Sequence, residues 1–464
     1  MPRTERATAC LLGAAFVLAC GQPPVAGVTA QSLAGAPVVV APSASTRAPG
    51  TPAITPPPAP SPTPSPAPAL ASKAGAAAAP GAKASQSNNA TSLTQDPLAT
   101  QILNGGSAAL KAVLATPEKY RFQVLYGVIT PGAAPKLERH GYRADVEYFF
   151  PASSMKVPIT LATYDRLATL RSAGKPALTR DATMRIHPVS GNAEPYVTTL
   201  ARETWRALIV SDNASANRLL AVVGHREAHE TLWPLGLPSV RIHDGFATGG
   251  EIDPAELSPR IEFVGADGGV TAELPARRSD LVLPATEATG LAIGKANIVD
   301  GRRVDGPLSF ADKNAIRLRE LQDTLVRIMR PDLLPAGSRP DTASKEDLAY
   351  VREALGTLPS TSGLAGFDRN VVADYQLSPF LRGIERVRAR GQFLIHSKVG
   401  QAFGFLIANA YIVDKATGRA FFLIASVYAN PDETMNDDTY AYDAISFPAL
   451  ADVGEAFCRH AFGP

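Results

Sequence analysis

A long stretch rich in alanine, proline and serine divides this chain and limits the part of it that can fold. Residues 21–93 contain runs such as TPAITPPPAPSPTPSPAPALAS, and many of the 40 prolines fall here. Such a composition offers too little bulky apolar surface to offset the entropy lost on ordering. Alternating proline also favours an extended, semi-rigid spacer. The sequence therefore predicts a disordered linker over 21–93 and a folded domain over 94–464.

The segment before this linker has the layout of an export signal. Arg3 and Arg6 precede an apolar run over residues 9–19, which is too short to span a bilayer. The letters VLAC before Gly21 are similar to a bacterial lipobox, in which the chain is cut before Cys20 and Cys20 is lipidated. The alternative is an ordinary secretory signal cut after Ala30. Both interpretations predict export. The first gives a signal over 1–20 and a lipid anchor that would hold the protein on a periplasmic or cell-surface membrane.

Composition excludes several other classes of function. The formal net charge is +2 and basic residues form no blocks, so we expect no nucleic-acid partner. Of the three cysteines only Cys458 lies in the folded part, where it is predicted to be a buried apolar residue. His225 and His229 in HREAH are spaced one helical turn apart, but they lack H-E-x-x-H order and a third ligand. They are interpreted as a solvated helix face, and no metal or cofactor is expected.

The sequence of the folded part predicts two early strands, a helical middle, and three late strands followed by a last helix. Alternating and β-branched residues predict strands over 120–130 and 142–152. Helical spacing follows over 153–174 and again between 195 and 235. Further elements are predicted from the same patterns: helices over 314–330 and 345–358, strands from residue 391 to 430 with a hairpin turn at KATG, and a helix over 442–462. If early and late strands share one antiparallel sheet, the fold is α+β with a cleft between its parts.

The stretch FFPASSMKVP places Ser153 three residues before Lys156. That offset puts both side chains on one face of a helix, and Ser153 at its N-terminus gains from the positive end of the dipole. A serine hydroxyl is a weak nucleophile unless a neighbouring base takes its proton, and a buried lysine with a lowered pKa can be that base. Taken alone the pair is also compatible with chance, because both residue types are common.

Two later elements carry similar chemistry. Ser211 and Asn213, in SDN, fall between two predicted helices, where the serine could relay a proton and the asparagine could bind an amide. Alone, SDN is also good helix-capping chemistry. The letters HSKVG place Lys398 and Gly400 on a late strand, where the lysine would supply charge and the glycine would let a ligand approach the backbone. Alone, this is an exposed lysine near a bend.

In this order, S-x-x-K, S-D-N and a late K-x-G resemble the signature of the penicillin-recognising serine enzymes, and of class A β-lactamases in particular. The resemblance covers residues 100–464 and includes the context of each motif. It implies a β-lactamase/transpeptidase-like α+β fold, with an antiparallel sheet flanked by helices, an all-helical subdomain and the active site in the cleft between. The chain is long between the second and third motifs, and an insertion is expected around 259–312.

The resemblance also implies catalytic roles. Ser153 would be the acylated nucleophile and Lys156 would assist the removal of its proton. Ser211 would pass a proton to the leaving nitrogen, helped by Lys398. No metal takes part in this chemistry.

For substrate binding, the resemblance implies that Asn213 contacts the acyl side chain. The backbone N–H groups of Ser153 and Gln401, next to Gly400, would form the oxyanion hole. One departure lies here: Val399 stands where the family usually has a threonine or serine that binds the β-lactam carboxylate. A lost charge-assisted hydrogen bond is worth about 1.5–3 kcal/mol.

A second departure concerns deacylation. Class A β-lactamases carry a glutamate in an E-x-E-L-N-like context that activates the hydrolytic water. Laid over this motif, PAELS puts Pro254 at that position, whereas anchoring on VRIHDGF puts Phe246 there. Glu251, Asp253 and Glu256 lie close in sequence but out of register. Without the base, an acyl-enzyme is expected to form and persist.

The main interpretation is a class A β-lactamase-like serine hydrolase that acts on a small-molecule β-lactam or a peptidoglycan-like substrate as a monomer, an activity that would give antibiotic resistance. The alternatives are a D,D-peptidase or other serine amidase or esterase on the same fold, and a non-catalytic peptidoglycan- or peptide-binding module. The complete set of motif residues argues against the binding module. The missing glutamate and Val399 argue for it.

Overall fold

The computed structural model describes residues 93–132, 134–248, 251–335, 343–367 and 372–463, with 251–253 as backbone. The predicted signal over 1–20 with its lipidation site Cys20, and the predicted linker as far as residue 92, lie outside the described residues. The described part belongs to one compact unit. None of its helices combines the length and the apolar character that crossing a membrane requires.

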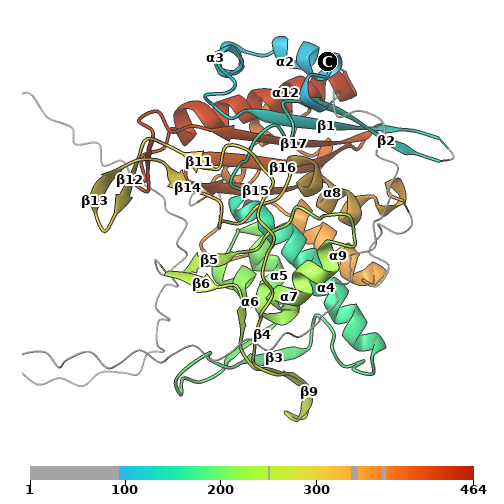
Figure 1. Ribbon diagram of the computed structural model, residues 1–464. Coiled ribbons are helices and arrows are strands. Elements are labelled where there is room, and N and C mark those ends of the chain that lie inside the picture. The colour runs from blue at the N-terminus through green and yellow to red at the C-terminus, as the bar shows by residue number, and fades with distance from the viewer. Residues whose placement is uncertain (1–92, 133, 249–250, 336–342, 368–371, 464) are drawn as a thin grey trace, which may run out of the picture. The chain divides into compact units, whose positions relative to one another are not determined.

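A five-stranded sheet joins the two ends of the folded part, as the sequence predicts (Figure 1). Its order is β15-β16-β17-β1-β2, and every neighbouring pair is antiparallel. The strands are β1 (Gln123–Thr130), β2 (Lys136–Tyr142), β15 (Phe393–Ala402), β16 (Phe405–Asp414) and β17 (Ala420–Tyr428). The early strands thus pair with the late ones, and β15 lies at an edge.

Helices cover both faces of this sheet (Figure 1). They are α2 (Pro97–Asn104), α3 (Ala108–Ala115), α4 (Lys156–Ser172), α5 (Leu200–Ile209), α6 (Asn213–Val223), α7 (His225–Leu232), α8 (Leu318–Met329), α9 (Lys345–Gly356), α10 (Asp374–Leu377), α11 (Leu381–Ile384) and α12 (Phe447–Phe462). Single turns are η1 (Ala152–Met155), η2 (Pro331–Leu333), η4 (Pro359–Thr361) and η5 (Tyr442–Ser446). The predicted helices over 153–174, 314–330 and 345–358 correspond to α4, α8 and α9.

Successive residues of the strands point to opposite faces, and both faces are buried. In β17, Phe421 and Leu423 pack in a cluster with α2, α3, α11 and α12. This cluster includes Cys458, which is buried as predicted. Phe422 and Ile424 pack in a second cluster with α4 to α9. The sheet therefore separates two cores.

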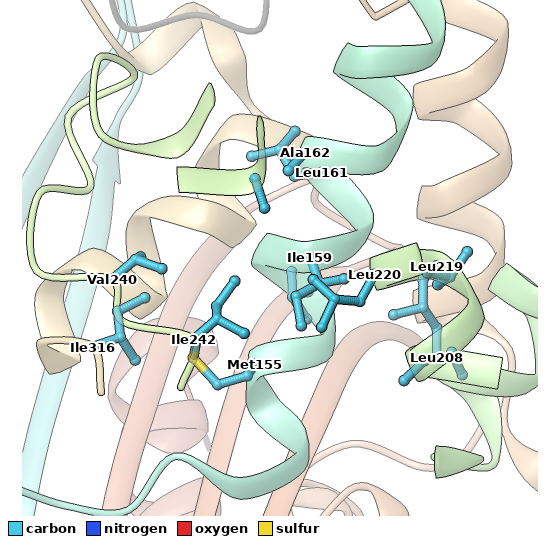
Figure 2. Close-up of a cluster of buried hydrophobic side chains, with 14 of the residues drawn as sticks. Met155, Ile159, Leu161, Ala162, Leu208, Leu219, Leu220, Val240, Ile242 and Ile316 are labelled. Carbon is cyan, nitrogen blue, oxygen red and sulfur yellow. The ribbon is translucent and has the colours of Figure 1, made fainter. Parts of the chain in front are cut away.

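The second cluster surrounds α4, most of whose length is buried. Figure 2 shows Met155 and Ile159 at the start of this helix pointing into the same group of side chains as Leu208, Leu220 and Ile242. The beginning of α4 is therefore enclosed by α5, α6 and the segment that follows α7.

The chain between residues 183 and 309 also forms short strands that the sequence did not predict. They are β3 (Thr183–Ile186), β4 (Tyr196–Thr199), β5 (Asp244–Thr248), β6 (Glu251–Pro254), β7 (Leu257–Ser258), β8 (Ile261–Val264), β9 (Val270–Leu274), β10 (Arg277–Arg278), β11 (Ala292–Ile293), β12 (Ala296–Val299), β13 (Arg302–Asp305) and β14 (Leu308–Ser309), followed late in the chain by β18 (Thr434–Met435). A four-stranded sheet has the order β4-β3-β8-β9, and β12 pairs with both β13 and β18. The segment 259–312, where an insertion is expected, supplies β8 to β14.

The second early strand was predicted in the wrong place. The strand is Lys136–Tyr142, whereas residues 143–147 form bends and turns and residues 148–150 have no regular secondary structure. Tyr148 and Phe149, which suggested a strand, are buried in the core without pairing in a ladder.

Candidate active site

Ser153 lies on the turn η1, directly before α4. The preceding residue, Ala152, has a φ of 47°, a left-handed conformation that residues with a side chain rarely adopt. The Ser154 hydroxyl donates to the carbonyl of Pro151 at 2.6 Å, which closes the turn. Ser154 is buried while Ser153 is only half-buried. The turn therefore holds Ser153 at the end of a rigid helix.

Gly400 of β15 packs directly against this turn. A methyl group on Gly400 would stand 2.3 Å from the carbonyl oxygen of Pro151 and 3.1 Å from the nitrogen of Ser154. Because the contact is with backbone, only glycine fits without moving η1. The late strand and the serine turn are thus in direct contact, as the predicted oxyanion hole at Ser153 and Gln401 requires.

Lys156 is the first residue of α4, and its side chain is fully buried. Its Nζ donates to the backbone carbonyl of Ser211, to Ser211 Oγ at 3.2 Å and to Asn213 Oδ1 at 2.7 Å. Three acceptors match the three N–H groups of an ammonium. The ring of Phe246 also lies over this nitrogen, with 4.8 Å between Nζ and the ring centroid, a cation–π distance.

Lys398 of β15 approaches the same hydroxyl from the sheet. Its Nζ donates to Ser211 Oγ at 2.8 Å and to the carbonyl of Val399 at 3.1 Å. Burial lowers the pKa of Lys398 to about 7. Ser211 itself has a φ of 59°, so this hydroxyl too is presented by a left-handed residue. The structure therefore brings Lys156, Ser211 and Lys398 together around one oxygen.

The SDN residues both cap a helix and bind a lysine of the site. Asp212 caps α6 by accepting from the nitrogen of Ser215 at 2.7 Å, and it pairs with Arg206 at 3.0 Å. Asn213 accepts from Lys156 through Oδ1 and donates through Nδ2 to the carbonyl of Ala247 at 2.9 Å. The capping interpretation and the site interpretation are compatible, because different side chains carry them.

Val399 faces away from these groups. It belongs to the cluster on the α12 side of the sheet and is 4% exposed, whereas Lys398 and Gly400 point to the opposite face. The neighbouring Gln401 is half-buried. Val399 is therefore a core residue of this chain, and it offers no hydroxyl to a ligand.

Phe246, one of the two residues that the sequence puts at the position of the family's glutamate, has its ring over Lys156. Asn217, one turn after Asn213 on α6, fixes its backbone. The Phe246 N–H donates to Asn217 Oδ1 at 2.7 Å, and Asn217 Nδ2 donates to the Phe246 carbonyl at 2.8 Å. Sequence analysis missed Asn217, although its helical spacing from Asn213 could have indicated it.

Of the three acidic residues near this position, the structure describes the side chain of Glu256. Its carboxylate forms an ion pair with Arg278, with 3.1 Å between the charged atoms. The side chains of Glu251 and Asp253 lie outside the described residues. Among the side chains that are described, no group of three His, Cys, Asp or Glu residues could hold a metal ion.

A serine on a turn before a helix, two buried lysines and a second serine between them, at the boundary of an antiparallel sheet and a helical part, are the features of a penicillin-recognising serine hydrolase. Residues 110–268 match the model of the β-lactamase enzyme family. This match contains Ser153, Lys156, Ser211 and Asn213 and ends before Lys398. The resemblance seen in the sequence is thereby confirmed for this stretch, which carries the first two motifs.

Several solved structures are similar to the chain at low identity. The chromosome-encoded β-lactamase of Vibrio parahaemolyticus is 15% identical, with a TM-score of 0.42, over 76% of this chain and 99% of that one. A β-lactamase from Burkholderia vietnamiensis is 18% identical, with a TM-score of 0.39, over 76% and 97%. A mutant of PBP-A, in an acyl-enzyme complex with penicillin G, is 12% identical, with a TM-score of 0.42, over 80% and 97%. No curated protein sequence matches the chain.

Proposed function

We propose that this protein is a class A β-lactamase-like serine hydrolase that acts through an acyl-enzyme on Ser153. The observation that carries the proposal is the Ser211 hydroxyl, which accepts from both Lys156 and Lys398 beside the turn that holds Ser153. A hydroxyl that accepts hydrogen bonds from two buried amines is placed to relay a proton, because it has an N–H donor on each side. A structural role alone would not require two lysines to lose their hydration.

Acylation would proceed as follows. Lys156 in its neutral form takes the proton of Ser153 while Ser153 Oγ attacks the substrate carbonyl carbon. The backbone N–H groups of Ser153 and Gln401 stabilise the developing oxyanion. The carbon–nitrogen bond then breaks, and Ser211 passes its proton to the leaving nitrogen.

Lys398 suits the task of resupplying Ser211. Its pKa of about 7 lies near physiological pH, where a group can both give and take a proton. The described partners of Lys398 are a hydroxyl and a carbonyl, both neutral. In its protonated form, Lys398 would therefore offer a substrate carboxylate a positive charge that no bonded acid cancels.

A second candidate, a penicillin-binding amidase or D,D-peptidase on the same fold, is favoured by Phe246. A phenyl ring over Lys156 cannot take a proton from water. It also leaves an apolar surface where the hydrolytic water would have to be activated. Slow deacylation and a long-lived adduct fit this second candidate better than fast drug hydrolysis.

Time-resolved intact-mass spectrometry with a penicillin and a chromogenic cephalosporin tests the proposal, with Ser153→Ala as the control. We expect an adduct on the wild type and none on the variant. An adduct that clears within seconds and leaves hydrolysed drug would support the β-lactamase. An adduct that stays would support the penicillin-binding enzyme. If neither drug adds mass, the β-lactam proposal fails, and esters, peptides and a binding role are the hypotheses to test next.

A further inference from the structure

The two histidines of HREAH bind the backbone N–H and the backbone carbonyl of a single residue, Ile242. They were interpreted as a solvated helix face, and this was wrong, because His225 is 5% exposed and His229 is not exposed at all. The Ile242 N–H donates to His229 Nε2 at 3.1 Å. His225 Nε2–H donates to the Ile242 carbonyl at 2.9 Å. One turn of α7 thus binds both polar groups of one residue.

Each imidazole is fixed in one tautomer by its other nitrogen. His229 Nδ1–H donates to the carbonyl of His225 at 2.8 Å, which leaves Nε2 as the acceptor. The Ser279 hydroxyl lies 2.8 Å from His225 Nδ1 and donates to it, because Nε2 carries the hydrogen. Neither ring has a hydrogen-bonding nitrogen left over for a metal or a ligand.

Both rings are neutral at physiological pH. Burial lowers the pKa of His225, and it lowers the pKa of His229 to about 3. The charged or titratable groups that face the pair come from several elements: Arg226 and Glu227 on α7, Arg241 and His243 beside Ile242, and Glu256 after β6. For both rings, desolvation has a larger effect on the pKa than any of these groups.

We call residues 242–247 the strap, and Ile242 is its first residue. Just before it, Arg241 exchanges two backbone hydrogen bonds with Ala315. Just after it, the N–H groups of His243 and Asp244 both donate to Asn314 Oδ1, at 2.8 and 3.0 Å. The backbone N–H and carbonyl of Ile242 have the two imidazoles as their partners, while its side chain is buried in the core with Met155 (Figure 2).

The far end of the strap meets the catalytic lysine. Phe246 places its ring over Lys156 Nζ, and the Ala247 carbonyl accepts from Asn213, whose other amide atom binds the same nitrogen. A shift of the strap along its length would therefore move the ring and turn the amide. Both changes alter the surroundings of the Lys156 amine.

We infer that His225 and His229 are positioning residues, which hold the strap at Ile242 and thereby set Phe246 and Asn213 against Lys156 for acylation. This rests on the proposed function, because it concerns the amine that takes the proton of Ser153. The histidines touch neither Ser153 nor Lys156. They act through the backbone that links them to the site.

The test compares three variants of the full-length protein. His229→Leu removes both hydrogen bonds of the ring. His229→Gln can keep an acceptor for Ile242 and a donor for His225. Leu232→Ala removes a buried apolar side chain from the same helix and leaves the hydrogen bonds of both histidines in place. Penicillin acylation is followed by stopped-flow intact mass to separate the limiting rate from the half-saturating concentration, and hydrogen exchange is measured over 242–247.

For His229→Leu we expect the limiting acylation rate to fall by about tenfold or more, because small misplacements of a reacting group cost that much. The half-saturating concentration should change little, and exchange in the strap should rise. Leu232→Ala should lose a similar amount of thermal stability and acylate at the wild-type rate. His229→Gln should recover the rate to within about threefold.

The inference is overturned if His229→Leu, folded and with a loosened strap, acylates as fast as Leu232→Ala. It is also overturned if the glutamine variant is as slow as the leucine variant. A wild type that takes no adduct would be a different result, since it would remove the proposed function and with it the reaction that the histidines serve.

Discussion

The chemistry of the site depends on one hydroxyl, that of Ser211, being shared by two amines. Lys156 reaches it from a helix and Lys398 reaches it from the sheet. Burying an ammonium is costly unless it is well hydrogen-bonded or gives up its charge. Lys156 donates to three acceptors, whereas Lys398 donates to two neutral ones and has a lowered pKa. The pKa of Lys398 therefore differs between the folded and the unfolded chain.

Because of this difference, the free energy of unfolding should depend on pH. The pKa of Lys398 is about 7 in the folded chain and near 10.5 when it is unfolded. Between these values the unfolded state binds more protons, so the free energy of unfolding rises with pH across this window. Lys398→Met removes the buried charge, and we expect it to be more stable than the wild type at pH 6 by about 1–3 kcal/mol. The gain should shrink toward pH 10.

Urea unfolding at pH 6, 8 and 9.5 measures this difference. Lys111→Met, at an exposed position on α3, is the matched control and should show no such pH dependence. A Lys398→Met difference that stays constant across the three pH values would contradict a lowered pKa for this lysine.

A second prediction at the scale of single residues concerns Phe246. Phe246→Glu would put a carboxylate against Lys156, where the nearby amine favours the ionised form. A general base contributes about 10²–10⁴-fold to a hydrolytic step, so the lifetime of the acyl-enzyme should fall by at least about tenfold. Phe246→Gln has nearly the same size as the glutamate variant without its charge. Equal adduct lifetimes for the two variants, measured by intact mass after removal of free drug, would argue against water activation at this position.

At the scale of elements, the contact between β15 and η1 joins the sheet to the nucleophile. Gly400 allows the strand to pass against the carbonyl of Pro151, and the same strand carries Lys398 on that face. The period of two along a strand explains the arrangement: residues 398 and 400 face the site, while Val399 faces the core behind it. The departure at Val399 thus follows from strand geometry, because its methyl groups fill a buried position.

Gly400→Ala should disturb the nucleophile more than the fold. The added methyl group would lie 2.3 Å from a backbone oxygen, so η1 must move. Overpacking of this kind costs about 1–3 kcal/mol. Acylation should fall by about 100-fold, because Ser153 moves with the turn. Gly269→Ala, where the nearest atoms belong to the side chain of Asp267 at 3.3 Å, is the control. Wild-type acylation kinetics in Gly400→Ala would show that the turn does not set the reacting geometry.

Elements with a strong period were predicted well from the sequence, and those without one were not. β16 and β17 are long and apolar on both faces, and α8 is amphipathic over its whole length. By contrast, β2 has the polar sequence KLERHGY at a sheet edge, and the aromatic residues after it misled the prediction. The short strands between 244 and 309 are fixed by tertiary contacts that no local pattern reveals.

The site residues divide in the same way. Ser153, Lys156, Ser211 and Lys398 could be predicted because each lies in a short motif whose local structure is strong. Asn217, His225 and His229 bind backbone groups far away in sequence, so their function depends on how α6 and α7 meet the strap. The burial of the two histidines could not be read from HREAH, since the same letters suit an exposed helix.

At the scale of the molecule, the sheet separates two cores and the site lies where α4 and α6 meet the edge strand β15. The core on the α12 side begins with α2, near the start of the described chain. Asp96 caps this helix, and its Oδ2 lies 3.0 Å from His140 Nδ1. Ala99 and Leu103 are fully buried within this core. The folded domain therefore needs α2.

Two truncations test where the domain begins. A chain that starts at Ser92 keeps α2, and we expect it to unfold at the same temperature as the full-length protein and to acylate at the same rate. A chain that starts at Ser107 loses the burial of Leu103 and Ala99, worth on the order of 3 kcal/mol. Its unfolding temperature should fall by about 3–6 °C. Because α2 lies on the far side of the sheet from Lys156, the shorter chain should still acylate at temperatures where it is folded. Equal loss of stability in both truncations would place the domain boundary before residue 92 and would contradict the linker that the alanine-, proline- and serine-rich composition predicts.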